Sequence, residues 1–294
     1  MGINYKKISI VIIAVIIIVS VILTQYDISS PAQGNDSKQS QKFFNFNIET
    51  KNADLIELPI DSIFKISGVR GEYIIDGNLQ QYGRLFFELD KNNQSLYDEL
   101  INTDEKTIVI YPIFTAVAYN VPGFYNYYKG ECDSECLTLS IKSILRAEIG
   151  GNGAQILKLL NYKFLSDIDI DKNPEILENF DKVILLHNEY VTKRQFDAIT
   201  SHPNVIYLYP NALYAEIEVN YDQNTITLIR GHGYPEKHID NGFDWEFDNT
   251  RPYEFDLECD NWKFYEIDNG KMLNCFPERQ LYEDNSLLKI LKEL

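Results

Sequence analysis

The chain has 294 residues, of which 45% are hydrophobic and 13% aromatic, so it can bury a substantial core and is not a disordered protein. Its 44 acidic residues outnumber the 27 Lys and Arg residues and give a formal net charge of −17. A surface of that sign repels phosphate backbones, and we therefore expect no nucleic-acid partner.

The first predicted element is a membrane helix at residues 8–26. Lys6 and Lys7 precede this uncharged stretch, the next charge is Asp27, and the length approaches the roughly 20 residues that span a bilayer. Positive charges on the N-terminal side predict a single-pass anchor, with residues 1–7 in the cytoplasm and the main domain outside it. A cleaved signal peptide is the alternative, and it exports the rest of the chain as well.

Two regions separate this helix from the main domain. Residues 27–42 are rich in Ser, Gln, Pro and Gly, which indicates a linker. Residues 43–104 contain the short alternating runs FNFNIE, EYIID and GRLFFELD, broken by Gly and Asn. This pattern predicts a small β-rich unit.

Strands alternate with helices over residues 105–232. The predicted strands are KTIVIYPIF, FLSDIDI (164–170), KVILLHNEY and NVIYLYP, with the acids of FLSDIDI alternating on an exposed face. Helical periodicity occurs in LTLSIKSILRAEIG, GAQILKLLNY, NPEILENF and VTKRQFDAITSHP. Apolar strands connected by helices predict an α/β fold with a doubly wound, mostly parallel sheet covered on both faces.

Residues 233–294 form a C-terminal extension. It loses the helical pattern, and we expect irregular or β-hairpin structure that ends in a short helix at 287–294. A turn at DNG (268–270) is the candidate hairpin.

The chain has four cysteines: Cys132, Cys136, Cys259 and Cys275. An even count in an exported chain predicts two disulfides, and three connectivities are open. A bond between the last two would close the hairpin and contribute on the order of 3 kcal/mol. A zinc site built from all four is the alternative, but their spacing is not that of a zinc ribbon.

Polar side chains follow three of the predicted strands. AYN (118–120) follows KTIVIYPIF, HNEY (187–190) ends KVILLHNEY, and PNALY (210–214) follows NVIYLY. Ligands bind beyond the carboxyl ends of parallel strands, so neighbouring strands would place these residues on one rim. The other interpretation is that strand ends become polar where they reach water. The side chains in question are Tyr119, Asn120, His187, Glu189, Tyr190 and Asn211.

These segments carry a family resemblance. AYN, a strand ending near Asp-x-Asp, HNEYV (187–191) and Tyr-Pro-Asn (209–211) follow one another over about residues 105–217. In their order, and in the number of residues between them, they resemble the AYN, Asp-x-Asp, HDEYW and GGN motifs in the C-terminal domain of the large (beta) subunit of N,N-dimethylformamidase. The resemblance implies a fold similar to class I glutamine amidotransferases.

The resemblance also implies a chemistry, namely hydrolysis of a linear amide C–N bond by a ferric ion held by two tyrosinates and a glutamate. Glu189 falls on the carboxylate ligand, and Tyr119 is the candidate for one phenolate. His187 would move protons and Asn211 would hold the amide, as the resemblance implies. Such hard anionic ligands suit Fe(III).

The second tyrosine ligand is not assigned. Tyr73 and Tyr82 lie upstream, in a region that does not align with the family.

Three departures from the family pattern alter the predicted pocket. Asn188 replaces an acid, Val191 replaces a tryptophan, and Tyr209 and Pro210 replace two glycines. The substrate therefore cannot be carried over. The second hypothesis is a catalytically inactive cell-surface binding or structural module on the same fold, with a second copy of the chain or a surface protein as partner in place of a small amide.

Three other patterns are weaker. DIDIDKNPEILE has the acid spacing of an EF-hand loop, but Lys172 stands where a glycine is needed and Pro174 begins a helix. GHGYPEKH, with His232 and His238, favours a surface loop over a metal site. GGNG (150–153) favours a helix–helix turn over a phosphate-binding loop.

No cysteine occupies a strand-to-helix turn, so glutamine hydrolysis is excluded.

Overall fold

The structure is a computed structural model. It describes residues 43–46, 53–72, 74–76, 79–81, 83–141, 149–246, 253 and 255–294. The predicted membrane helix (8–26), the linker (27–42), Tyr73 and Tyr82 lie outside these residues. No helix within the described ranges is long and apolar enough to cross a membrane.

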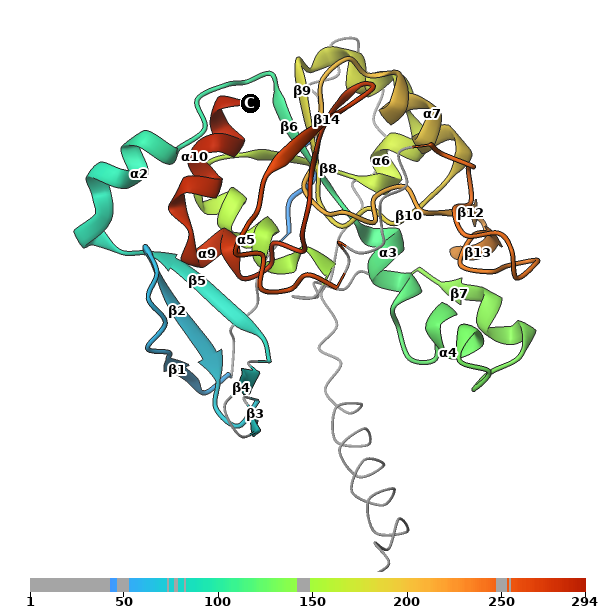
Figure 1. The fold of residues 1–294 in the computed structure, drawn as a ribbon, viewed down its shortest axis with the longest axis horizontal. Helices are drawn as coiled ribbons and strands as arrows, with labels where there is room; N and C mark the ends of the chain where they lie inside the picture. Colours follow the sequence, from blue (N-terminus) through green and yellow to red (C-terminus); the bar gives the residue numbers. More distant parts are fainter. Residues whose placement is uncertain are drawn as a thin grey trace, which may run out of the picture.

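A six-stranded sheet forms the centre of the molecule (Figure 1), in the order β14-β15-β11-β9-β6-β8. Its members are β6 (Thr107–Tyr111), β8 (Lys163–Ser166), β9 (Lys182–Leu185), β11 (Val205–Tyr207), β14 (Phe264–Ile267) and β15 (Gly270–Leu273). All neighbours are parallel except β14, which pairs antiparallel with β15. The chain is therefore a mixed α/β protein with a parallel sheet, as predicted.

Helices cover both faces of this sheet, because its apolar side chains alternate between two separate cores. Val109 and Ile184 belong to one core, and Ile108 and Val183 belong to the other. The first core includes side chains of α5 (Gly151–Leu159), α9 (Gln280–Glu283) and α10 (Asn285–Glu293). The second includes side chains of α6 (Asp167–Lys172), the 3-10 helix η4 (Pro174–Asn179) and α7 (Lys193–Ser201).

A second sheet lies beside the C-terminal end of β9, in the order β10-β12-β13-β7. Its strands are β10 (Tyr190–Val191), β12 (Ala215–Asn220), β13 (Thr225–Arg230) and β7 (Thr138–Ser140). Three short helical segments precede β7 in the chain: α3 (Ile113–Ala118), α4 (Phe124–Tyr128) and the 3-10 helix η2 (Ser134–Leu137).

The N-terminal region is mostly β structure. A three-stranded antiparallel sheet contains β1 (Leu55–Glu57), β2 (Phe64–Val69) and β5 (Leu85–Leu89), and a two-stranded one contains β3 (Ile74–Asp76) and β4 (Leu79–Gln81). The 3-10 helix η1 (Lys91–Asn93) and α2 (Gln94–Leu100) then lead to the central sheet.

Two predicted strands give way to helices earlier than the sequence pattern indicated. KTIVIYPIF stops at Tyr111, and α3 begins directly after Pro112. FLSDIDI stops at Ser166, whose hydroxyl accepts the N–H of Asp169 while that carboxylate accepts the N–H of Ser166. This capping box starts a helix, so the acids do not alternate on a strand, and Asp167 is buried.

One predicted helix is also different. Thr138–Ser140 of this segment form β7, which pairs with β13 in the second sheet, whereas residues 142–148 lie outside the described residues. A segment as short as β7 carries too few residues for its sequence periodicity to distinguish a helix from a strand. The predicted helices α5, α7 and α10 are confirmed.

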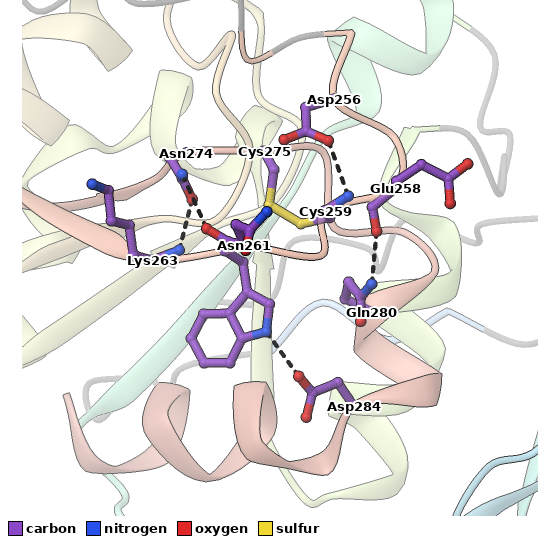
Figure 2. Close-up of a disulfide and its surroundings, with 10 residues drawn as sticks. Asp256, Glu258, Cys259, Asn261, Lys263, Asn274, Cys275, Gln280 and Asp284 are labelled. Atoms are coloured by element: carbon purple, nitrogen blue, oxygen red, sulfur yellow. Dashed lines mark hydrogen bonds between the residues drawn. A yellow bond between two sulfur atoms is a disulfide. The ribbon is translucent and has the colours of Figure 1, made fainter.

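The four cysteines form two disulfides, Cys132–Cys136 and Cys259–Cys275, which excludes the four-cysteine zinc site. The second bond closes the predicted β14–β15 hairpin. Around it, Gln280 donates to the carbonyl of Glu258 and Trp262 donates to Asp284 (Figure 2). Within the C-terminal extension, these bonds hold residues 258–262 against α9 and the start of α10. Disulfides of this kind are typical of proteins outside the reducing cytoplasm.

Candidate functional site

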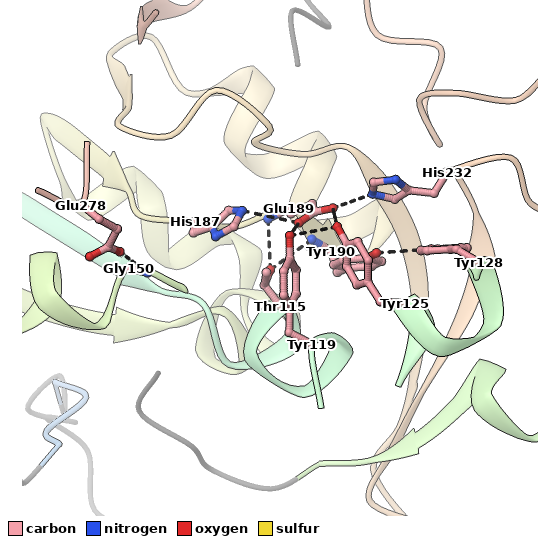
Figure 3. Close-up of polar contacts among 10 residues, drawn as sticks. All are labelled: Thr115, Tyr119, Tyr125, Tyr128, Gly150, His187, Glu189, Tyr190, His232 and Glu278. Carbon is pink, nitrogen blue, oxygen red and sulfur yellow. Dashed lines mark hydrogen bonds and ion pairs between the residues drawn. The ribbon is translucent and has the colours of Figure 1, made fainter. Parts of the chain in front are cut away.

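The site lies where β9 ends and combines side chains from four segments (Figure 3). The strand end presents His187 and Glu189, and the segment after β13 presents His232. Thr115 and Tyr119 come from α3 and its C-cap, and Tyr125 comes from α4. The structure thus brings together three of the residues predicted from the sequence, because β6 and β9 are neighbours in the parallel sheet.

The centre of the site is the Glu189 carboxylate, which is 0% exposed. Its Oε2 accepts a hydrogen bond from the Tyr119 hydroxyl at 2.7 Å and lies 3.4 Å from His187 Nε2. Its Oε1 lies 2.5 Å from His232 Nε2 and 3.2 Å from the Tyr125 hydroxyl, which donates to it. A buried carboxylate needs such partners, because burial without them costs several kcal/mol.

The backbone at this strand end is held on two sides. The Thr115 hydroxyl oxygen accepts the N–H groups of both Glu189 (3.0 Å) and Tyr190 (3.1 Å). The Glu189 carbonyl accepts the N–H groups of Tyr214 and Ala215. The direction of the carboxylate is therefore fixed by α3 and by the chain that follows β11.

The charge of the site follows from these contacts. Burial raises the pKa of Glu189, but the neighbouring His187 and His232 imidazoles outweigh this effect and lower the pKa to about 2. Burial raises the pKa of Tyr119 well above its usual range, and the Glu189 charge adds to this effect. The site without a metal is therefore a carboxylate that accepts hydrogen bonds from the Tyr119 and Tyr125 hydroxyls and has one imidazole beside each of its oxygens.

His232 is enclosed by aromatic rings. The centroids of Tyr125, Tyr128, Tyr190 and Tyr214 lie 4.4–5.9 Å from the centroid of its imidazole. Its side chain is 16% exposed, whereas Glu189 is closed to solvent. His232 therefore reaches the buried carboxylate through a shell of tyrosine rings.

Three buried polar side chains lie at the ends of β9 and β11 without hydrogen-bond partners. The side-chain nitrogen and oxygen atoms of His187, Asn188 and Asn211 make no hydrogen bond to any described residue. Each such group costs about 1–3 kcal/mol when left unsatisfied. Buried unpaired groups at one rim are typical of a site that receives a polar ligand or water. The structure does not bring Asn211 into hydrogen-bond contact with Glu189.

The donor set near Glu189 includes two phenols. Tyr119 was expected there, and Tyr125, whose hydroxyl also donates to Glu189, is the second. The sequence left the second tyrosine ligand unassigned, and Tyr73 and Tyr82 lie outside the described residues. Within the described ranges, no three side chains of His, Cys, Asp or Glu are arranged to hold a metal ion. Asn120 follows Tyr119 at the end of α3.

Tyr125 and His232 are the site residues that the sequence did not reveal. Tyr125 lies only five positions after the AYN motif, and this closeness in sequence could have marked it as a candidate site residue. His232 stands between Gly231 (φ +124°) and Gly233 (φ +78°) and itself has φ +53°. A Cβ on Gly231 would lie 3.0 Å from the Ala215 Cα, so the turn that presents the imidazole requires glycine there.

The surface-loop interpretation of residues 231–238 is correct for one histidine only. His238 is 77% exposed and pairs with Glu236. His232 instead contacts the buried Glu189 carboxylate, so the loop is part of the site.

Comparison of the chain with protein-family models gives no match, and comparison with the curated proteins gives none either.

Proposed function

We propose that the chain is an extracytoplasmic, membrane-anchored amide hydrolase that uses a ferric ion held by Glu189, Tyr119 and Tyr125. The observation that carries this proposal is the convergence of three oxygen donors from these side chains at one buried point. The sequence resemblance to the dimethylformamidase large subunit, with its amidotransferase-like fold, supports the same assignment.

The residues present fit such an ion. The Tyr119 hydroxyl lies 2.7 Å from Glu189 Oε2 and 2.9 Å from the Tyr125 hydroxyl, which lies 3.2 Å from Glu189 Oε1. Oxygen ligands about 2.0–2.2 Å from one ion lie about 3 Å apart, which matches these separations. Two phenolates and a carboxylate would also balance three positive charges in a dry site. Loading would release the phenol protons.

The chain's own residues supply the rest of the chemistry. When bound, the ion would polarise a carbonyl oxygen and lower the pKa of a water molecule. His187 and His232, one on each carboxylate oxygen of Glu189, are placed to hold and move protons. Asn211, with an unpaired amide at the same rim, would hold the substrate amide. Tyrosine rings around His232 exclude water from this side.

One observation favours a second candidate, a binding or structural module without turnover. The Glu189 carboxylate already has four protein neighbours and is fully buried, so the site is satisfied without an ion. The two candidates differ in whether the purified protein takes up metal.

Metal loading tests the proposal. Full-length protein is loaded with ferric iron, and iron content and visible absorbance are measured for wild type, Glu189→Gln, Tyr125→Phe and the matched control His238→Gln. We expect about one iron per chain and a tyrosinate charge-transfer band in wild type and His238→Gln. Glu189→Gln should lose both, and Tyr125→Phe should weaken the band.

Hydrolysis of a panel of small amides, with and without iron, then identifies the substrate. A folded wild-type protein that stays colourless and free of iron after loading would contradict the hydrolase and favour the binding module.

A further inference from the structure

We infer that Tyr209, tethered by Glu278, is a positioning residue that sets the plane of the His187 ring. The rings of Tyr209 and His187 are stacked, with centroids 5.3 Å apart and planes at 10°. Phe276 packs edge-on against both, at 5.1–5.2 Å. All three rings therefore form one block beside Glu189.

Ring contacts, rather than hydrogen bonds, orient the His187 imidazole. Neither of its ring nitrogens makes a hydrogen bond to a described residue, and its polar contact is the 3.4 Å approach to Glu189. The χ2 torsion of a histidine side chain has a broad distribution of values. An imidazole without hydrogen bonds can therefore rotate about χ2 unless neighbouring groups pack against its faces. The stack on Tyr209 supplies that restraint.

Tyr209 is itself fixed at its far end. Its hydroxyl donates to Glu278 Oε1 at 2.7 Å. The same oxygen accepts the N–H of Gly150 at 2.8 Å, and Figure 3 shows this second contact. A Cβ on Gly150 would lie 3.1 Å from the Leu186 Cβ, and one on Gly153 would lie 2.9 Å from the Leu281 Cδ1. The glycines of GGNG therefore allow this turn to pack closely beside the Tyr209 hydroxyl.

The tether comes from the C-terminal extension. Phe276 and Glu278 follow Cys275 directly, and the Cys259–Cys275 disulfide fixes that point of the chain (Figure 2). A segment distant in sequence therefore forms one wall of the site. This inference rests on the proposed function only for the role of His187 as a proton carrier. The orientation of the His187 ring itself can be measured without metal or substrate.

The experiment uses full-length, metal-free protein carrying isotope-labelled histidine. The chain has four histidines, so four ring resonances are expected, and His187→Gln assigns one of them. Tyr209→Leu removes the stack and should shift the His187 resonance by several linewidths while those of His202 and His238 stay in place. The matched control is Tyr207→Leu, which removes a buried tyrosine bonded to Asn269 in the other core.

If Tyr209→Leu does not fold, two less disruptive variants test the hydrogen bond between Tyr209 and Glu278. Glu278→Ala should move or broaden the His187 resonance, and Glu278→Gln, which keeps an oxygen acceptor, should restore it. In an active, loaded enzyme, Glu278→Ala should lower kcat about 10- to 100-fold with KM unchanged.

An unmoved His187 resonance in Tyr209→Leu or Glu278→Ala overturns the inference, as does an equal shift in Tyr207→Leu. A shifted resonance in a protein that takes up no iron would leave the inference standing and remove only the proposed function.

Discussion

Thr115 shows how one side chain determines the geometry of the site. It is fully buried, and its hydroxyl oxygen accepts two backbone N–H groups, from Glu189 and Tyr190. Thr115→Val keeps the shape but leaves both N–H groups buried without an acceptor, at about 1–3 kcal/mol each. We expect the free energy of unfolding, measured in urea, to fall by about 2–4 kcal/mol.

Thr115→Ser is the matched control, because it keeps the hydroxyl and loses one methyl group. It should cost about 1 kcal/mol, the size of one buried methylene. Equal losses in the two variants would mean that packing, and not the two hydrogen bonds, accounts for the role of Thr115.

The sequence identified part of the site at residue level. Glu189, His187 and Tyr119 follow predicted strands, and strand ends of a parallel sheet meet at one edge. Tyr125 and His232 come from a short helix and a glycine-flanked turn, where no periodicity relates sequence position to direction. Their contact with Glu189 depends on how those segments fold back, which only the structure shows.

Asp167 links two elements near the site. It begins α6, is 1% exposed, and its Oδ2 accepts the N–H of Phe114 in the first turn of α3, the helix that carries Thr115 and Tyr119. Burial raises the pKa of Asp167 well above its usual range, although backbone N–H groups oppose this. The contact therefore couples the placement of α3 to the protonation of a buried acid.

The sign of that coupling gives a prediction. Because the folded state raises this pKa, Asp167 contributes stability at pH values below its unfolded pKa, and this is lost as pH rises through the folded pKa. Asp167→Asn keeps an oxygen acceptor for Phe114 and has no proton to lose. Between pH 4 and 7, we expect the wild type to lose stability relative to this variant, by at most about 1.4 kcal/mol per pH unit.

Urea unfolding of both proteins across this pH range measures the difference. Asp133→Asn, at an exposed position, is the control and should follow the wild type. A constant gap between wild type and Asp167→Asn would show that this carboxyl group has the same pKa in the folded and unfolded states.

Elements with a clear periodicity or turn signal were predictable, and the two short helices beside the site were not. The helices α5, α7 and α10 and the β14–β15 hairpin follow from periodicity and turn residues. The helix α3 begins within an apolar run that looks like a buried strand, and α6 lies in a stretch that alternates like one. A proline and a capping box decide the outcome. These two elements flank the site, so the sequence was least informative where position matters most.

At the scale of the whole molecule, a short N-terminal segment is fastened to the edge of the central sheet. The N–H of Phe44 donates to the Phe164 carbonyl on β8, the edge strand, at 2.7 Å. The Phe46 ring packs on Tyr111 and Phe164, and Lys158 lies over its other side. An uncovered sheet edge promotes aggregation, and this segment covers part of it.

Phe46 therefore connects the segment 43–46 to the core. It is 6% exposed, whereas Phe43, three residues earlier, is 38% exposed. Phe46→Ala removes a nearly buried ring and should lower the free energy of unfolding by about 3 kcal/mol, while Phe43→Ala should cost less than about 1 kcal/mol. Light scattering near the unfolding midpoint should rise earlier in Phe46→Ala, because β8 and the Tyr111 ring become accessible. Similar losses for the two variants would mean that the segment does not hold to the sheet edge in solution.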